Sequence, residues 1–126
     1  MTKILIIDDD ADFVEANRIV LEAEGYDVDF AYDGDEGLAK LQKIKPDILI
    51  LDVMMKSNSE GFSLAQKMSN DPVLKTIPIL MISSVQRKTG FHFDYRTDTD
   101  YIPVDNFLEK PVSPEQLIAA VKALVH

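Results

Sequence analysis

Short, mostly apolar runs recur along the chain and alternate with stretches that have helical spacing. These runs fall at residues 3–7, 48–52, 79–82 and 106–108. Runs of this length, rich in Ile and Leu, predict strands that are buried on both faces of a parallel sheet. Residues 27–31 alternate polar and apolar side chains instead, which predicts a half-exposed strand at the edge of that sheet.

The segments between these runs carry apolar residues at helical intervals. This spacing predicts helices over residues 11–24, 34–43 and 61–70, and a last helix from residue 114 to the C-terminal end. Strands that alternate with helices predict an α/β fold, in which helices cover both faces of a doubly wound, five-stranded parallel sheet. Residues 85–105 show neither a helical nor a strand period.

Several helix boundaries are marked by residues that stabilise helix ends. Before the first helix, Asp10 or Asp12 can accept hydrogen bonds from free backbone N–H groups, and Gly25 is expected to end that helix. Ser113 and Gln116 have the spacing of a capping box before the last helix. The inward face of the first helix is expected to consist of Phe13, Ala16, Val20 and Leu21.

Composition and charge limit the class of protein. With 126 residues, 46% of them hydrophobic, the chain suits one compact domain over residues 1–126. A net charge of −9 disfavours direct binding to nucleic acid or anionic lipid. No stretch approaches the roughly 20 apolar residues of a membrane span, and the first apolar run is too short for a signal peptide. We therefore expect a soluble cytoplasmic protein without a membrane partner.

Acidic, hydroxyl and basic residues stand where the predicted strands end. Asp8 and Asp9 follow the first strand, and Asp52 ends the third. Ser83 follows the fourth apolar run, and Lys110 follows the fifth. Because the carboxyl ends of parallel strands lie at one edge of the sheet, where open α/β folds bind ligands, these groups are expected to meet.

This grouping of side chains indicates phosphoryl-transfer chemistry. Three carboxylates at one edge cannot all stay ionised without a cation between them, and oxygen ligands without His or Cys select Mg²⁺ or Mn²⁺. The Lys110 ammonium and the Ser83 hydroxyl can hold the oxygens of a phosphoryl group. We therefore interpret Asp52 as the nucleophile, with the other acids on the metal and Lys110 balancing charge.

Four motifs stand at these strand ends in order along the chain. They are Ile7-Asp8-Asp9, Leu51-Asp52-Val53-Met54-Met55, Ile82-Ser83-Ser84 and Phe107-Leu108-Glu109-Lys110-Pro111. Together they make nearly the whole chain resemble the receiver domain of two-component response regulators. The resemblance implies the flavodoxin-like strand order 2-1-3-4-5. It also implies a stand-alone, chemotaxis-regulator-like switch that is not a turnover enzyme.

The resemblance assigns roles to the residues expected around the metal. Asp52 matches the phosphoacceptor, which takes a phosphoryl group from a histidine kinase or phosphotransfer protein. Asp9 matches the acid that binds Mg²⁺ directly, and Asp8 matches its neighbour, which often acts through water. The backbone carbonyl of Met54 matches the third protein ligand of the metal.

The resemblance also implies how phosphorylation is transmitted. Ser83 matches the hydroxyl residue that turns toward the phosphoryl group, and Phe107 matches the aromatic residue whose rotamer follows it. Lys110 matches the lysine of the family's last motif. Output would then pass through an unknown downstream protein, without direct contact to nucleic acid.

The main departure from the family lies in residues 85–105, where receiver domains have their fourth helix. Only residues 85–88 could form a helical turn. The segment also holds four of the ten aromatic residues, which argues against disorder. We therefore expect a fourth helix that is short or replaced by an ordered loop.

Three other functions compete with this interpretation. A receiver-like interaction module that is never phosphorylated would usually lack one of the acidic, Ser or Lys residues. A Mg²⁺-dependent phosphatase of the haloacid dehalogenase type would share the Asp-x-Asp of Asp8 to Asp10, but Asp12 stands where that class has Thr or Val. A flavodoxin-like cofactor binder would need a phosphate-binding loop after the first strand, where this chain has acids that repel phosphate.

Overall fold

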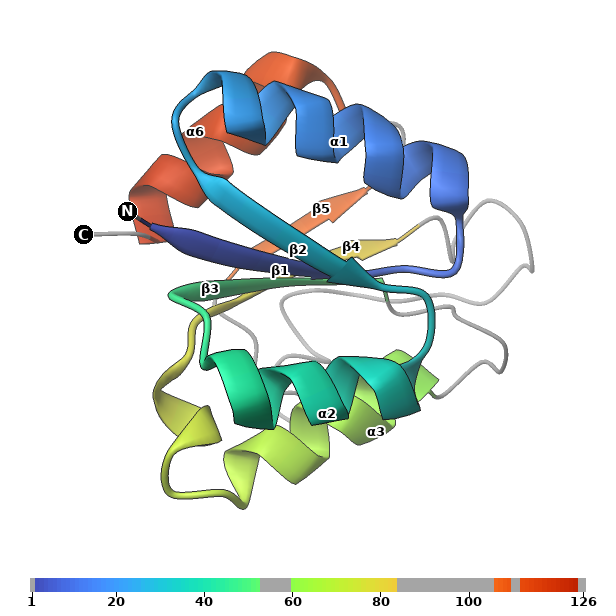
Figure 1. Ribbon diagram of the computed structural model, residues 1–126, viewed down its shortest axis with the longest axis vertical. Coiled ribbons are helices and arrows are strands. Elements are labelled where there is room, and N and C mark those ends of the chain that lie inside the picture. Colours follow the sequence, from blue (N-terminus) through green and yellow to red (C-terminus); the bar gives the residue numbers. More distant parts are fainter. Residues whose placement is uncertain (1, 53–59, 84–105, 110–111, 125–126) are drawn as a thin grey trace.

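A sheet of five parallel strands forms the centre of the molecule (Figure 1). The computed structural model describes residues 2–52, 60–83, 106–109 and 112–124. The strands are β1 Lys3–Ile7, β2 Asp27–Ala31, β3 Ile48–Asp52, β4 Ile79–Ser83 and β5 Asn106–Glu109. Their order is β2-β1-β3-β4-β5 and each neighbouring pair is parallel, so the predicted order and direction are confirmed.

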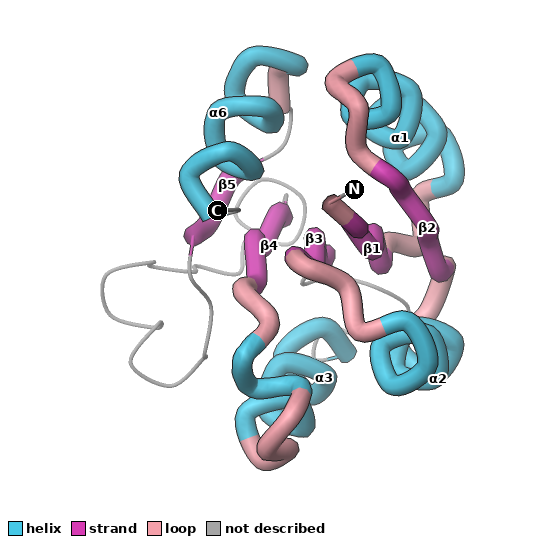
Figure 2. The backbone as a smooth tube through the Cα atoms, turned by 60° about the vertical axis from the view of Figure 1, so that its left-hand side comes forward, coloured by secondary structure: helices cyan, strands magenta, loops and turns pink. Residues whose placement is uncertain are grey.

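Helices cover both faces of this sheet (Figures 1 and 2). The helices are α1 Ala11–Ala23, α2 Gly34–Ile44, α3 Glu60–Ser69 and α6 Pro114–Leu124, and a short 3₁₀ helix, η1 Leu74–Thr76, precedes β4. The first and last of these helices, α1 and α6, lie on one face, and α2 and α3 lie on the other. This is the doubly wound α/β arrangement that the alternation of strands and helices predicts.

The strand side chains divide between two hydrophobic cores, one on each face of the sheet. Leu5 and Ile7 of β1 belong to the core that contains residues of α2 and α3, whereas Ile4 and Ile6 belong to the core that contains residues of α1 and α6. All four side chains are fully buried. Burial of alternate residues on opposite faces requires apolar residues at every position, which explains the uninterrupted runs in the sequence.

The inward face of α1 was predicted as Phe13, Ala16, Val20 and Leu21, and the structure confirms it only in part: Leu21 is fully buried and Phe13 is partly buried against the same core. The buried residues are Val14, Asn17 and Leu21, while Ala16 is exposed. Asn17 tolerates burial because its Nδ2 donates a hydrogen bond to the carbonyl of Phe13 at 2.6 Å. Apolar spacing alone does not indicate that a polar residue such as Asn17 lies on this face.

The helix ends follow the predicted chemistry. Asp10 is the N-cap of α1 and accepts hydrogen bonds from the N–H groups of Asp12 and Phe13, which settles the choice between Asp10 and Asp12. Gly25 has a φ of +93°, a left-handed conformation that suits glycine just after a helix. Ser113 Oγ accepts from Gln116 N–H at 3.1 Å, and Gln116 Oε1 accepts from Ser113 N–H at 3.0 Å, as in a capping box.

The predicted loop over residues 85–105, with its short or absent fourth helix, lies outside the described residues. In the part of the chain that the structure describes, no helix combines the length and the apolar character that crossing a bilayer requires.

Candidate functional site

Three carboxylates meet at the carboxyl ends of two neighbouring strands. In the pairing of β1 with β3, Ile7 lies opposite Leu51. Asp8 follows Ile7, and Asp52 follows Leu51 as the last residue of β3, so the two acids leave the sheet side by side. Carboxylate oxygens of Asp8, Asp9 and Asp52 all lie within 4.8 Å of one another. The predicted acidic cluster is therefore present.

Backbone contacts fix the position of Asp8. Its N–H donates to the carbonyl of Ala31, at the end of β2, over 3.1 Å. Its Oδ1 accepts a hydrogen bond of 2.9 Å from the N–H of Asp10. The carboxylate is thus tied to the turn that leads into α1, while the Asp10 carboxylate is used as the helix cap. The neighbouring acids therefore have different functions, although they look equivalent in the sequence.

The Ala31 carbonyl is a part of the site that the sequence does not reveal. Any residue type supplies a backbone carbonyl, so no side-chain motif marks this position. The only available signal is the end of the second strand, which lies beside the first in the sheet.

The surroundings of the cluster favour a small divalent cation. Asp8 is 1% exposed and Asp52 is 4% exposed, whereas Asp9 is open to solvent. Carboxylates that are buried this close together repel one another, and water is too scarce beside the two buried ones to screen that repulsion. A hard cation would offset the repulsion and could be reached through the exposed Asp9. The set of donors consists of oxygen atoms alone, which fits Mg²⁺ or Mn²⁺ and not the softer metals that Cys selects.

The other predicted residues are placed only in part. Ser83 ends β4, one residue beyond Ile82, which lies opposite Asp52 in the strand pairing. The backbone of Ser83 therefore lies at the same edge of the sheet as the acids. Phe107 lies in β5 opposite Met81, farther from that edge. The side chains of Ser83 and Phe107, together with Met54 and Lys110, lie outside what the structure describes.

One family of proteins and several curated relatives match nearly the whole chain. The sequence model of the response regulator receiver domain family matches residues 4–122. The DNA-binding dual master transcriptional regulator RpaA of Synechocystis sp. is 36% identical, over 99% of this chain and 49% of RpaA. Protein PilG of Pseudomonas aeruginosa is 33% identical, over 98% of this chain and 87% of PilG. The chain thus spans about half the length of RpaA but most of PilG.

Solved structures match the fold over the same extent. The chemotaxis response regulator CheY4 of Vibrio cholerae superimposes with a TM-score of 0.85 at 28% identity, covering 99% of both chains. A two-component response regulator from Clostridium difficile gives a TM-score of 0.82 at 31% identity, covering 98% of this chain and 95% of that one. These similarities extend across the strands that carry the acidic cluster.

Proposed function

Because the chain belongs to the response regulator receiver domain family, we propose that Asp52 is its phosphoacceptor. The family consists of phosphoacceptor modules of two-component signal transduction, which histidine kinases phosphorylate and which are not turnover enzymes. The observation that carries the proposal is the position of Asp52, which ends β3 and is 4% exposed. The carboxylates of Asp8 and Asp9 lie within 4.8 Å of its own.

The proposed reaction is transfer of a phosphoryl group from a phosphohistidine to the Asp52 carboxylate. A carboxylate oxygen of Asp52 attacks phosphorus, and an O–P bond forms as the N–P bond breaks. The electron pair of the N–P bond remains on the departing imidazole. The product is an acyl phosphate at the end of β3.

We assign the cation site to Asp8, Asp9 and Asp52, with Mg²⁺ as the expected ion and Mn²⁺ as a substitute. When bound, such an ion neutralises charge on the phosphoryl oxygens. The chain's own contribution is to hold the carboxylates in place. Asp8 is held through its contacts with Ala31 and Asp10, and Asp52 is the last residue of a buried strand.

The resemblance supports the remaining assignments. Met54 would supply a backbone carbonyl to the cation, and Lys110 would pair with the phosphoryl oxygens. Ser83 would donate its hydroxyl to the phosphoryl group, and Phe107 would change rotamer with it. The backbone of Ser83 at the carboxyl end of β4 is consistent with this role.

We further propose that residues 1–126 act as one receiver unit in the cytoplasm and pass the signal to a downstream protein. The charge of −9 supports a protein partner over direct contact with nucleic acid. The similarity to PilG, of which the chain covers 87%, supports a unit of this size.

The experiment that tests the proposal is intact mass spectrometry after incubation with acetyl phosphate and Mg²⁺. We expect one phosphoryl adduct, which disappears in Asp52→Asn and when Mg²⁺ is removed by chelation. Asp47→Asn is the matched control. Asp47 directly precedes β3, at the other end of the strand from Asp52, and accepts a hydrogen bond from the Lys3 N–H. This variant should form the adduct as the unchanged protein does.

An adduct of equal yield in Asp52→Asn would refute the assignment of the acceptor. If neither an adduct nor Mg²⁺ binding is found in the folded protein, the phosphorylation-independent interaction module is the better explanation. Mg²⁺ binding without an adduct would call for the same test with a phosphorylated histidine kinase as donor.

A further inference from the structure

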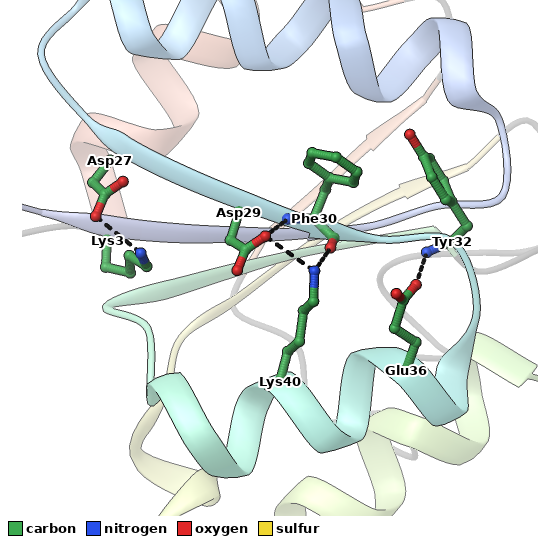
Figure 3. Close-up of polar contacts among 7 residues, drawn as sticks. All are labelled: Lys3, Asp27, Asp29, Phe30, Tyr32, Glu36 and Lys40. Carbon is green, nitrogen blue, oxygen red and sulfur yellow. Dashed lines mark hydrogen bonds and ion pairs between the residues drawn. The ribbon is translucent and has the colours of Figure 1, made fainter.

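We propose that Lys40 and Glu36 of α2 close the outer edge of β2 against strand addition by a second copy of this chain. The strand β2 ends the sheet on one side, since it pairs with β1 alone. An unpaired strand edge presents backbone N–H and C=O groups, to which a strand from another chain can add. The structure places side chains of α2 on these groups (Figure 3).

The backbone pairing defines which groups face outward. In a parallel pair, the N–H and C=O of one residue point to the same side, and those of the next residue point away. The Asp27 N–H donates to the Thr2 carbonyl at 2.9 Å, and the Ala31 carbonyl accepts from the Asp8 N–H at 3.1 Å. These residues therefore face β1, and the residues one position out of phase, Phe30 and Tyr32, face the open edge.

Three of the outward-facing groups carry hydrogen bonds to side chains. The carbonyl of Phe30 accepts from Lys40 Nζ at 2.5 Å, and the Phe30 N–H donates to Asp29 Oδ1 at 2.8 Å. The N–H of Tyr32 donates to Glu36 Oε1 at 3.0 Å. An added strand would have to displace these contacts before it could form its own hydrogen bonds.

The Lys40 ammonium lies at the rim of the sheet itself. Its Nζ is 3.1 Å from Asp29 Oδ1 and 5.3 Å from the centroid of the Phe30 ring. Because neighbouring residues of a strand project to opposite faces, contact with both side chains places the ammonium between the faces. It also orients Asp29, which in turn accepts from the Phe30 N–H. One lysine thus supports two of the three hydrogen bonds.

Electrostatics keeps the Asp29 carboxylate charged and available. Burial raises the pKa of Asp29, but the hydrogen bond from the Phe30 N–H and the neighbouring Lys40 ammonium outweigh that effect and leave the pKa below its ordinary value. The Asp29 and Lys40 side chains are 32% and 30% exposed, so both lie partly within the surface.

A second copy of the chain is the partner that this edge fits. Every copy carries the same edge, so two β2 strands can pair about a two-fold axis and satisfy both edges at once. With Lys40 and Glu36 in place, each edge already has three of its outward groups, the Phe30 N–H and C=O and the Tyr32 N–H, in hydrogen bonds with side chains. We infer that these two side chains favour the separate chain over a β2–β2 dimer.

The test is a double variant, Lys40→Met with Glu36→Ala. Met keeps the apolar stem of Lys40 but cannot donate a hydrogen bond, and the two changes together leave the net charge at −9. The matched control is Lys43→Met with Asp35→Ala, on the same helix and with the same charge balance. Lys43 and Asp35 are exposed, and no described residue forms a hydrogen bond or ion pair with their side chains.

Two measurements are needed, sedimentation velocity over a range of concentrations and residue-resolved amide hydrogen exchange. At low concentration, we expect the Tyr32 amide, which loses its Glu36 acceptor in the double variant, to exchange roughly two- to tenfold faster, as loss of one hydrogen bond implies. The Phe30 amide keeps its Asp29 acceptor but loses the lysine that holds it, and should exchange faster by a smaller factor. At high concentration, the variant should sediment as a larger species than the unchanged protein, and the same amides should regain protection. The control should match the unchanged protein in both measurements.

Faster exchange without any change in sedimentation would overturn the proposal, because the edge would be open and still not associate. Equal association of the control would overturn it too, since the effect would then not belong to the edge. The single variants Lys40→Met and Glu36→Ala provide the same readouts if the double variant folds poorly. Neither Mg²⁺ nor a phosphodonor is required, so the result is independent of the proposed phosphorylation.

Discussion

Asp71 is a single side chain that fixes the turn between α3 and β4. Its Oδ1 accepts hydrogen bonds from the N–H groups of Val73 and Leu74, at 2.8 and 3.1 Å. The Leu74 and Val73 N–H groups hold the pKa of Asp71 below its ordinary value. Because hydrogen bonding favours the charged form in the folded protein, its contribution to stability is present above the unfolded pKa, about 3.9. The contribution is lost as pH falls through the lower, folded pKa.

We therefore expect the carboxyl carbon of Asp71 to titrate with a midpoint below about 3.9 in NMR spectra. Asn at this position keeps an oxygen acceptor but cannot titrate. The melting temperature of Asp71→Asn should accordingly fall less steeply than that of the unchanged protein as pH drops below about 4. A midpoint at or above the ordinary value would contradict the hydrogen-bond explanation.

Ser113 is a second position where one side chain fixes the start of an element. It exchanges two hydrogen bonds with Gln116 before the first turn of α6 is complete. Loss of the hydroxyl in Ser113→Ala should lower the free energy of unfolding by about 1 kcal/mol. Denaturant unfolding measures this change, and Ser113→Thr, which keeps the hydroxyl, should recover most of it. Equal losses in the two variants would assign the effect to packing instead of capping.

At the scale of elements, β3 is one of the strands that contribute side chains to both hydrophobic cores. Its five residues are all buried, and Leu49 is fully buried in the core beside α2 and α3. Replacement by Ala removes apolar contacts and leaves a cavity, so Leu49→Ala should cost about 2–5 kcal/mol of unfolding free energy. Val73 is 50% exposed, and Val73→Ala should change stability by no more than about 0.5 kcal/mol. Chemical denaturation of the two variants tests this contrast.

The elements differ in how far the sequence specifies them. The strands were predictable because a strand covered on both faces must be apolar throughout, as in β1 and β3. The capping box at Ser113 was predictable because its hydrogen bonds join residues three apart. The place of Asn17 on the inward face of α1 was not predictable, because a polar residue is buried there only through its hydrogen bond to the Phe13 carbonyl. The 3₁₀ helix η1 has three residues, too few to show a period.

At the scale of the whole molecule, the acidic cluster was predictable because the fold alone brings it together. Asp8 and Asp52 are 44 residues apart in sequence, and parallel pairing of β1 with β3 places them side by side. It was less apparent from the sequence which of the three consecutive acids belong to the cluster. Asp10 caps α1, whereas Asp8 and Asp9 lie with Asp52 in the cluster. The roles of Met54, Ser83, Phe107 and Lys110 depend on side chains and loops that strand periodicity does not specify. They stay predictions.

The acidic cluster should also lower the stability of the molecule when no cation is bound. Two of its three carboxylates are buried, and all three lie within 4.8 Å of one another. Removal of one charge in Asp52→Asn should therefore raise the free energy of unfolding in chelator at neutral pH by about 1–3 kcal/mol. This variant would be more stable than the unchanged protein while lacking the proposed function.

With Mg²⁺ bound, the unchanged protein should become more stable than Asp52→Asn. An ion that binds only the folded state stabilises it by about 2.7 kcal/mol at a hundred times its Kd. The unchanged protein should gain this stability in thermal melts with increasing Mg²⁺, whereas Asp52→Asn, with a weaker site, should gain much less. Asp35→Asn removes an exposed acid outside the cluster and should leave both the chelator value and the Mg²⁺ response nearly unchanged. If Asp52→Asn has no stability gain in chelator and a full response to Mg²⁺, the three carboxylates do not act as one cation site.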